Sequence, residues 1–197
     1  ELDRASRPFM DFIDDLSTWY VRRSRDRFKG SDEADKKKAL ETTLYVLRET
    51  ATLLAPFMPF TAESIFQKVR NEEDQISVHM EKWPELIERN GEALENMESV
   101  RKAVSALLEV RAKSGMKVRQ PLAKAILKST DLAERNELLN IIAEEINVKE
   151  VVVDDSIDSE VELDLVLTPE LEDEGLSRDL IRSIQAARKN AGLSPKD

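Results

Sequence analysis

The stretch "LLAPFMPF", residues 53–60, interrupts the clearest helical pattern in the first half of the chain. Pro56 and Pro59 each lack a backbone N–H, and each disfavours the α conformation in the residue before it. Apolar residues follow helical spacing before this stretch and resume it afterwards. The stretch therefore predicts two helices joined at a proline-broken junction, with Thr61 capping the second one.

Working outward, the apolar spacing predicts helices over 9–28, 34–54, 61–68 and 92–114. Gly30-Ser31-Asp32 is expected to end the first helix and cap the second. The segment 76–85 is predicted to be extended and to cover one end of the helices. The second helix carries a continuous apolar face, which is typical of a bundle and consists of Leu40, Leu44, Leu47, Ala51 and Leu54.

The pattern changes near residue 116. Strands are predicted over 122–127, 149–154 and 161–167, and helices over 131–146 and 170–190, with Gly192 and Pro195 ending the last helix. The predicted fold class is mainly α: a helical bundle over 1–115, followed by a small α+β domain over 116–197 with three short strands and two helices.

The composition excludes several classes of protein. The chain has 197 residues and no cysteine, which excludes disulfide frameworks, zinc ribbons and thiol catalysis and fits a cytoplasmic setting. No apolar run is long enough to cross a bilayer, and no signal peptide opens the chain, so no membrane partner is expected. The first residues read as the middle of a helix, which indicates a fragment of a longer protein, truncated at its N-terminus.

The first basic cluster is "WYVRRSRDRF", residues 19–28, in a chain whose net charge is −10. On an α-helix, at about 100° per residue, Arg22, Arg25 and Lys29 form one outward stripe. Like charges so close repel each other unless an anion lies over them, and phosphate suits the guanidinium fork. A solvated helix face and a polyanion-binding site both remain open on spacing alone.

The other residues of this cluster suggest different roles. Arg23 and Arg27 lie nearer the apolar face, so they are expected to pair with acidic residues of a neighbouring helix. Trp19 lies between the two groups and offers a plane on which an unpaired base can stack.

A second basic cluster is "RAKSGMKVR", residues 111–119, which contains no acid. Arg111, Lys113, Lys117 and Arg119 supply its charge. A solvated linker between domains and an RNA contact explain it equally well.

No residue pattern indicates catalysis or a metal. His79 is the only histidine and has no cysteine or spaced carboxylate pair beside it. Asp14 and Asp15 diverge on a helix, and Ser177 and Asp179 have no histidine nearby. We therefore expect no catalytic residues and no metal site.

Five stretches, in order along the chain, closely resemble the anticodon-binding end of isoleucyl-tRNA synthetases, which are class I enzymes. They are "FIDDLSTWYVRRSRDRF" (12–28), "LLAPFMPFTAESIF" (53–66), "SVHMEKWPE" (77–85), "VRAKSGMKVRQPL" (110–122) and "ELEDEGLSRDLIRSIQAARKNAGL" (170–193). The resemblance implies a parent isoleucine–tRNA ligase that activates isoleucine with ATP and Mg²⁺, transfers it to its tRNA and edits misloaded valine.

The signatures of that chemistry and the editing domain are absent from this chain, so the resemblance implies a tRNA-binding, non-catalytic region without a cofactor of its own. Its implied partners are the anticodon stem-loop of isoleucine tRNA and the remaining catalytic and editing domains of the parent; whether the parent carries a zinc-binding tail stays open. Two alternatives remain, a helical protein-interaction module and the anticodon domain of a valyl- or leucyl-type synthetase. The predicted tRNA-binding residues are Trp19, Arg22, Arg25 and Lys29, with Arg23, Arg27, Arg111, Lys113, Lys117 and Arg119.

Overall fold

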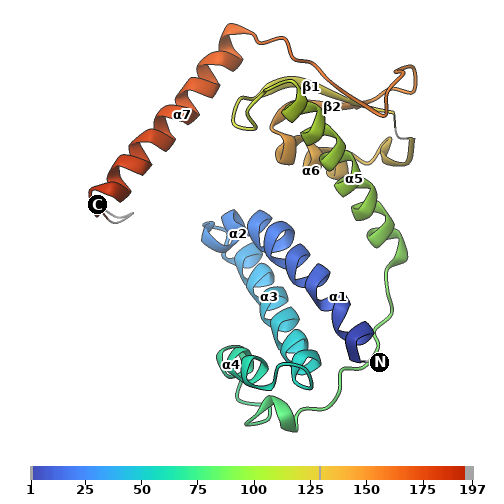
Figure 1. The fold of residues 1–197 in the computed structure, drawn as a ribbon, viewed down its shortest axis with the longest axis vertical. Helices are drawn as coiled ribbons and strands as arrows, with labels where there is room; N and C mark the ends of the chain where they lie inside the picture. The colour runs from blue at the N-terminus through green and yellow to red at the C-terminus, as the bar shows by residue number, and fades with distance from the viewer. Residues whose placement is uncertain (1, 129, 194–197) are drawn as a thin grey trace. The chain divides into compact units, whose positions relative to one another are not determined.

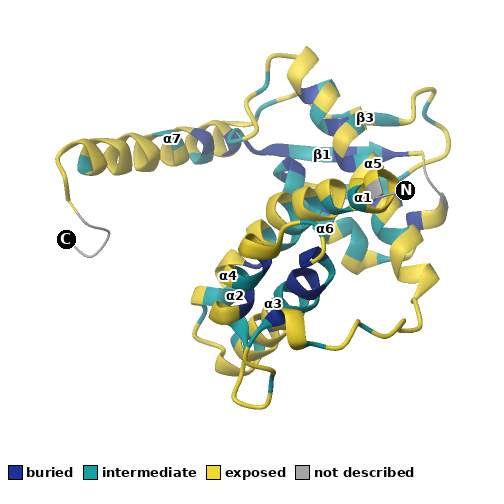
Figure 2. Ribbon diagram, turned by 60° about the horizontal axis from the view of Figure 1, so that its bottom comes forward, coloured by how far each residue is buried: buried dark blue, intermediate teal, exposed yellow. Residues whose placement is uncertain are grey.

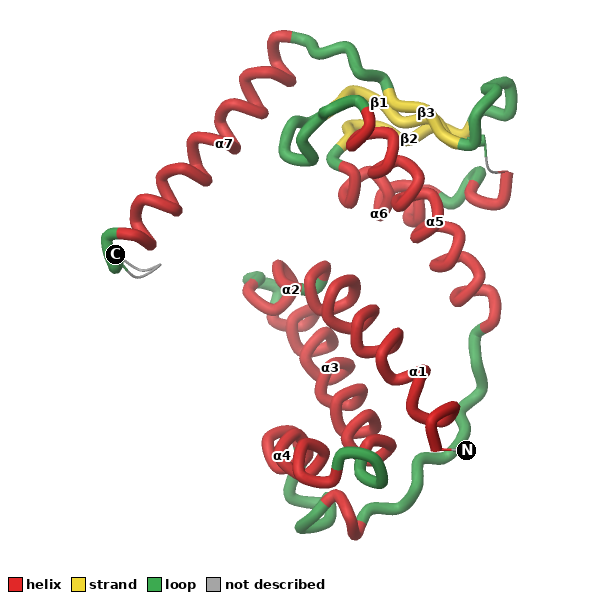
Figure 3. The backbone as a smooth tube through the Cα atoms, viewed as in Figure 1, coloured by secondary structure: helices red, strands yellow, loops and turns green. Residues whose placement is uncertain are grey.

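The computed structural model describes residues 2–128 and 130–193, and the chain divides into two compact units between Ile87 and Glu88. The N-terminal unit is helical, whereas the C-terminal unit holds a small sheet with helices (Figures 1 and 3). The fold class predicted from the sequence, mainly α with a small α+β part, is confirmed.

The N-terminal unit follows the predicted order of helices. Its first predicted helix forms as three consecutive pieces, α1, a π-helix (η1) and α2, with Ser24 buried between the last two. Gly30 ends α2, and the side chain of Asp32 caps α3 by accepting from the backbone N–H groups of Ala34 and Asp35, as expected. The elements are α1 (Leu2–Asp14), η1 (Asp15–Val21), α2 (Arg25–Lys29), α3 (Glu33–Leu54), α4 (Pro59–Val69) and the 3₁₀ turn η2 (Val78–Met80).

The proline junction ends α3 at Leu54 and starts α4 at Pro59. The predicted cap at Thr61 is wrong, because the cap position is Met58 and Pro59 occupies the first turn. Proline suits that place, since its missing N–H has no partner in a first turn and its φ is already helical. The helix therefore starts two residues earlier than the apolar spacing indicates.

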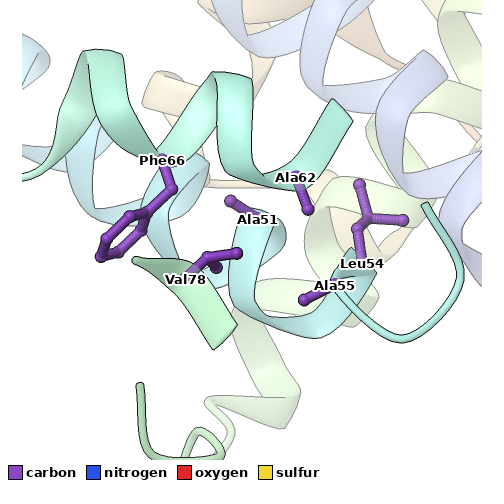
Figure 4. Close-up of a cluster of buried hydrophobic side chains, with 6 residues drawn as sticks. All are labelled: Ala51, Leu54, Ala55, Ala62, Phe66 and Val78. Carbon is purple, nitrogen blue, oxygen red and sulfur yellow. The ribbon is translucent and has the colours of Figure 1, made fainter. Parts of the chain in front are cut away.

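The core of the N-terminal unit lies where α3, α4 and η2 meet (Figure 4). Small alanines on α3 and α4 allow the two helices to approach, and the fully buried ring of Phe66 fills the space beside Val78. Glu63 holds η2 in place, because its carboxylate accepts from Ser77 Oγ at 2.9 Å and Val78 N at 3.0 Å. The segment predicted as extended thus turns at 78–80 to insert Val78 into the core.

Two residues of the predicted apolar face of α3 are not covered. Leu40 and Leu44 are 43% and 46% exposed, whereas Ala51 and Leu54 are buried. The compact unit holds α1, α3 and α4 but not the fourth predicted helix, so it covers only part of this face.

The fourth predicted helix, α5 (Gly91–Lys113), belongs to the C-terminal unit, where it packs against α6, β3 and η3. For that reason the division between the compact units lies earlier than the domain boundary predicted at 115/116. The remaining elements are β1 (Leu122–Leu127), η3 (Thr130–Leu132), α6 (Asn136–Ile146), β2 (Val148–Val153), β3 (Val161–Leu163) and α7 (Pro169–Asn190).

The sheet has the strand order β2-β1-β3. Strand β1 pairs parallel with β2 through the α6 crossover and antiparallel with β3, so that Ala125 lies opposite both Val151 and Leu163. The third strand is shorter than predicted. After Asp164 N donates to Lys124 O, the Asp164 carboxylate accepts from Val166 N and turns the chain out of the sheet.

Helix α7 follows this turn and is exposed along most of its length (Figure 2). It ends close to the predicted residue, with Gly192 at φ +73°, a backbone conformation that favours glycine. Pro195, predicted to contribute to this end, lies outside the described residues.

We predict that Phe66→Ala lowers the free energy of unfolding of the N-terminal unit by about 3–4 kcal/mol, because it empties the centre of the core. Urea unfolding followed by tryptophan fluorescence measures this change, since both tryptophans precede residue 88. Phe60→Ala is the matched control: its ring is 90% exposed, so a change within about 0.5 kcal/mol is expected. Equal losses in the two variants contradict the assignment of this core.

Candidate nucleic-acid interface

Trp19 lies in the π-helix η1, half-buried, between two arginines. The guanidinium carbon of Arg22 is 5.9 Å from the centre of the indole ring, and that of Arg23 is 5.8 Å away. Both distances are within the range of cation–π attraction. The structure therefore brings together these three predicted site residues, and π-helical turns are frequently found at functional sites.

The outward stripe consists of three exposed cations, one of which is anchored by a hydrogen bond. Arg22 is exposed and its Nε donates to Thr18 O at 2.6 Å, which restrains its guanidinium group. Arg25 and Lys29, on α2, are exposed, and among the described residues neither makes an ion pair. These two charges are open to an anion from solvent.

Arg27 links two helices. Its Nε and Nη2 donate to the two carboxylate oxygens of Asp35 on α3, at 2.8 and 2.7 Å. This hydrogen-bonded fork raises the pKa of Arg27 and lowers the pKa of Asp35. The expectation that Arg27 pairs with an acid of a neighbouring helix is confirmed, and its guanidinium is committed to that contact.

The position of Arg111 differs from the expectation that the second basic cluster lies on the surface. It was predicted as a tRNA contact, but its side chain is only 1% exposed. Nη1 donates to the carbonyl oxygens of Lys117 at 2.7 Å and Gln120 at 2.8 Å, and Nη2 donates to that of Asn147 at 3.2 Å. Burial lowers the pKa of the guanidinium. Arg111 thus holds the turn that carries Lys117 and Arg119, and is not available to an anion at the surface.

The other three cations of that cluster lie in different surroundings. Lys113 pairs with Glu109 one turn earlier on α5, at 2.7 Å. Arg119 Nε donates to Asp179 on α7 at 2.9 Å, and Lys117 is exposed on the same turn. The cluster therefore is not one continuous surface, and only Lys117 and Arg119 face α7.

Asn147 is a structural residue that the sequence analysis did not single out. It ends α6 in the left-handed conformation, at φ 55°. Its Nδ2 donates to the carbonyl oxygens of Val118 and Arg119, and its Oδ1 accepts from Arg178 of α7 at 2.7 Å. An asparagine directly between an apolar helix and a β-branched strand is the sequence signal for this conformation.

Among residues 2–128 and 130–193, no group of three histidine, cysteine or acidic side chains is placed to hold a metal ion.

No helix in the described part of the chain has the length and apolar character needed to span a membrane.

Comparisons with known proteins show which family this chain resembles. A family model described as the anticodon-binding domain of tRNA ligase matches residues 1–127. An isoleucine–tRNA ligase of Treponema denticola is 39% identical over 168 residues, which cover 82% of this chain and 15% of that protein. One of Protochlamydia amoebophila is 40% identical over 157 residues, which cover 77% and 15%. The chain thus matches about 15% of the length of these curated relatives.

We predict that Arg111→Met destabilises the C-terminal unit by about 2–4 kcal/mol, because three backbone carbonyl groups lose the charged donor of a buried side chain. Far-ultraviolet circular dichroism during urea unfolding reports this loss, since every tryptophan and tyrosine lies in the N-terminal unit. Lys113→Met, two residues further along the same helix, removes an exposed charge and is expected to change stability by less than about 0.5 kcal/mol. Similar effects of the two substitutions argue against a structural role for Arg111.

Proposed function

Because this chain belongs to the anticodon-binding domain family of tRNA ligases, we propose that it is the anticodon-recognition region of an isoleucine–tRNA ligase. In this proposal its partner is isoleucine tRNA, and the rest of the parent chain, in the cytoplasm, attaches isoleucine with ATP and Mg²⁺. The isoleucine specificity rests on the resemblance to the isoleucine–tRNA ligases of Treponema denticola and Protochlamydia amoebophila.

The observation that carries the proposal is the exposed basic surface of η1 and α2. Arg25 and Lys29 have no ion-pair partner among the described residues, and Arg22 lies beside the indole of Trp19. A chain with a net charge of −10 repels polyanions except where cations are concentrated. We assign phosphate contacts to Arg22, Arg25 and Lys29, and stacking of an unpaired anticodon-loop base to Trp19 together with its arginines.

Three of the other predicted contacts receive different assignments. Arg27 and Arg111 are structural, as their hydrogen bonds to Asp35 and to backbone carbonyl groups indicate. Arg23 orients Trp19 through its cation–π contact. The proposed interface of the N-terminal unit is thus narrower than the basic cluster in the sequence.

We predict that Arg25→Glu weakens binding to an isoleucine-tRNA anticodon stem-loop by about tenfold or more, since a charge-assisted phosphate contact contributes about 1.5–3 kcal/mol. Fluorescence anisotropy against salt concentration measures it, and Arg25→Ala is expected to reduce the slope of log affinity against log salt by roughly 0.7–0.9. A stem-loop with a scrambled anticodon tests base recognition.

Lys68→Glu is the matched control, because it places the same charge change on α4, at the end of the N-terminal unit far from α2 (Figure 1). Its affinity is expected to stay within about twofold of the wild type, as long-range effects between exposed charges are screened by salt. If the two variants weaken RNA binding equally, Arg25→Glu acts only through the net charge of the chain. Binding of an acidic protein but of no RNA favours the interaction-module alternative instead.

A further inference from the structure

The outer part of α7 has an unusual charge balance for this chain. Residues 180–193 contain Arg182, Arg188 and Lys189 and no acidic residue, although acids outnumber bases overall by 40 to 30. Arg182 and Lys189 are exposed, like most of this helix (Figure 2). The positive charge is therefore displayed to solvent.

The inner part of α7 is held firmly against the turn 117–120. Gln120 Nε2 donates to Leu171 O at 2.6 Å, and Glu174 accepts from Lys149 at 2.6 Å. Gly175 leaves room for this contact, because a Cβ there would lie 2.1 Å from Gln120 Oε1 and would displace the Gln120 side chain. The register of α7 on the turn is thereby set, and with it the position of each cation relative to Lys117 and Arg119.

One carboxylate lies among three cations where the turn meets the helix. Asp179 accepts from Arg119 at 2.9 Å, and both groups are about two-fifths exposed. The pKa of Asp179 is lowered by this hydrogen bond first, and further by the charges of Lys117 and Arg182. A single negative charge does not neutralise three positive ones, and the excess charge favours an added anion.

Two basic residues of this part also share one side of the helix. At about 100° per residue, Arg182 and Lys189 lie within about 20° of each other and about 10 Å apart along the helix, at about 1.5 Å per residue. Arg178 lies on the same side but is committed to Glu174 and Asn147. The opposite side is apolar and consists of Leu176, Leu180, Ile184 and Ala187. A narrow row of cations of this length fits a chain of phosphates better than one small anion.

We propose that Lys117 and Arg119 of the turn, together with Arg182 and Lys189 of α7, form a second RNA-binding surface that contacts the sugar-phosphate backbone. The inference rests on the proposed function, and it adds a contact on the C-terminal unit to the one on η1 and α2. The surface is assigned to phosphates and not to base stacking, because no aromatic side chain lies among its four cations. It supplies affinity and salt dependence, whereas anticodon selectivity resides in the N-terminal unit.

The test uses the full chain with the double substitution Arg182→Ala and Lys189→Ala. These residues make no ion pair with another described residue and are exposed, so the fold is expected to be unchanged. Anisotropy with isoleucine tRNA should show a salt slope reduced by roughly 0.7–0.9 for each residue removed. The same reduction is expected in an Arg25→Glu background. Lys128→Ala, an exposed lysine at the far end of β1 from the turn, is the control and should leave the slope unchanged.

Each outcome decides between the two RNA surfaces. Loss of affinity in Arg25→Glu with an unchanged slope in the double variant overturns this second surface and leaves the anticodon proposal in place. The opposite result is a reduced salt slope in the double variant, without an effect of Arg25→Glu and without a preference for the isoleucine anticodon. It supports this surface and overturns anticodon recognition. The inference is overturned if the chain binds no RNA at low salt, or if a poly-glutamate peptide binds this surface as tightly as RNA does.

Discussion

The buried guanidinium of Arg111 is the constraint on which the C-terminal unit depends. Among the described residues it makes no ion pair; its two Nη atoms donate to the carbonyl groups of Lys117, Gln120 and Asn147, whereas its Nε has no partner. Removing a cation from water costs free energy unless its donors are satisfied, so these carbonyls must keep their places. The end of α5, the turn after it and the end of α6 therefore form one assembly. That assembly places Lys117 and Arg119 on its outer side, and the start of α7 packs against it.

Arginine has two separate roles in this acidic chain. Some arginines connect elements, as Arg27 does through Asp35 and Arg119 does through Asp179, and their charge is matched by a carboxylate. Others remain on the surface without such a match, as Arg25 and Arg182 do. The excess of acids elsewhere opposes non-specific attachment of polyanions and confines them to these places. An acidic net charge and RNA recognition are thus compatible.

The elements of the fold were predictable from local sequence, whereas the role of each cation was not. Prolines at 56 and 59 and the cap at Asp32 act within a few residues, so their effects can be read from spacing. The burial of Arg111 depends on carbonyls contributed from as far away as Asn147, which no helical period reveals. Leu40 and Leu44 show the same limit, because spacing identifies an apolar face but not what covers it.

The π-helix between α1 and α2 has a consequence for how relatives of this protein diverge. A residue gained or lost within η1 turns the helical continuation α2 by about 100° relative to α1. Phe9, which contacts Phe57, lies on α1 before this point, whereas Arg25 and Lys29 lie on α2 directly after it and change direction relative to α1. A change of length at this single place therefore alters which way the cations of α2 point.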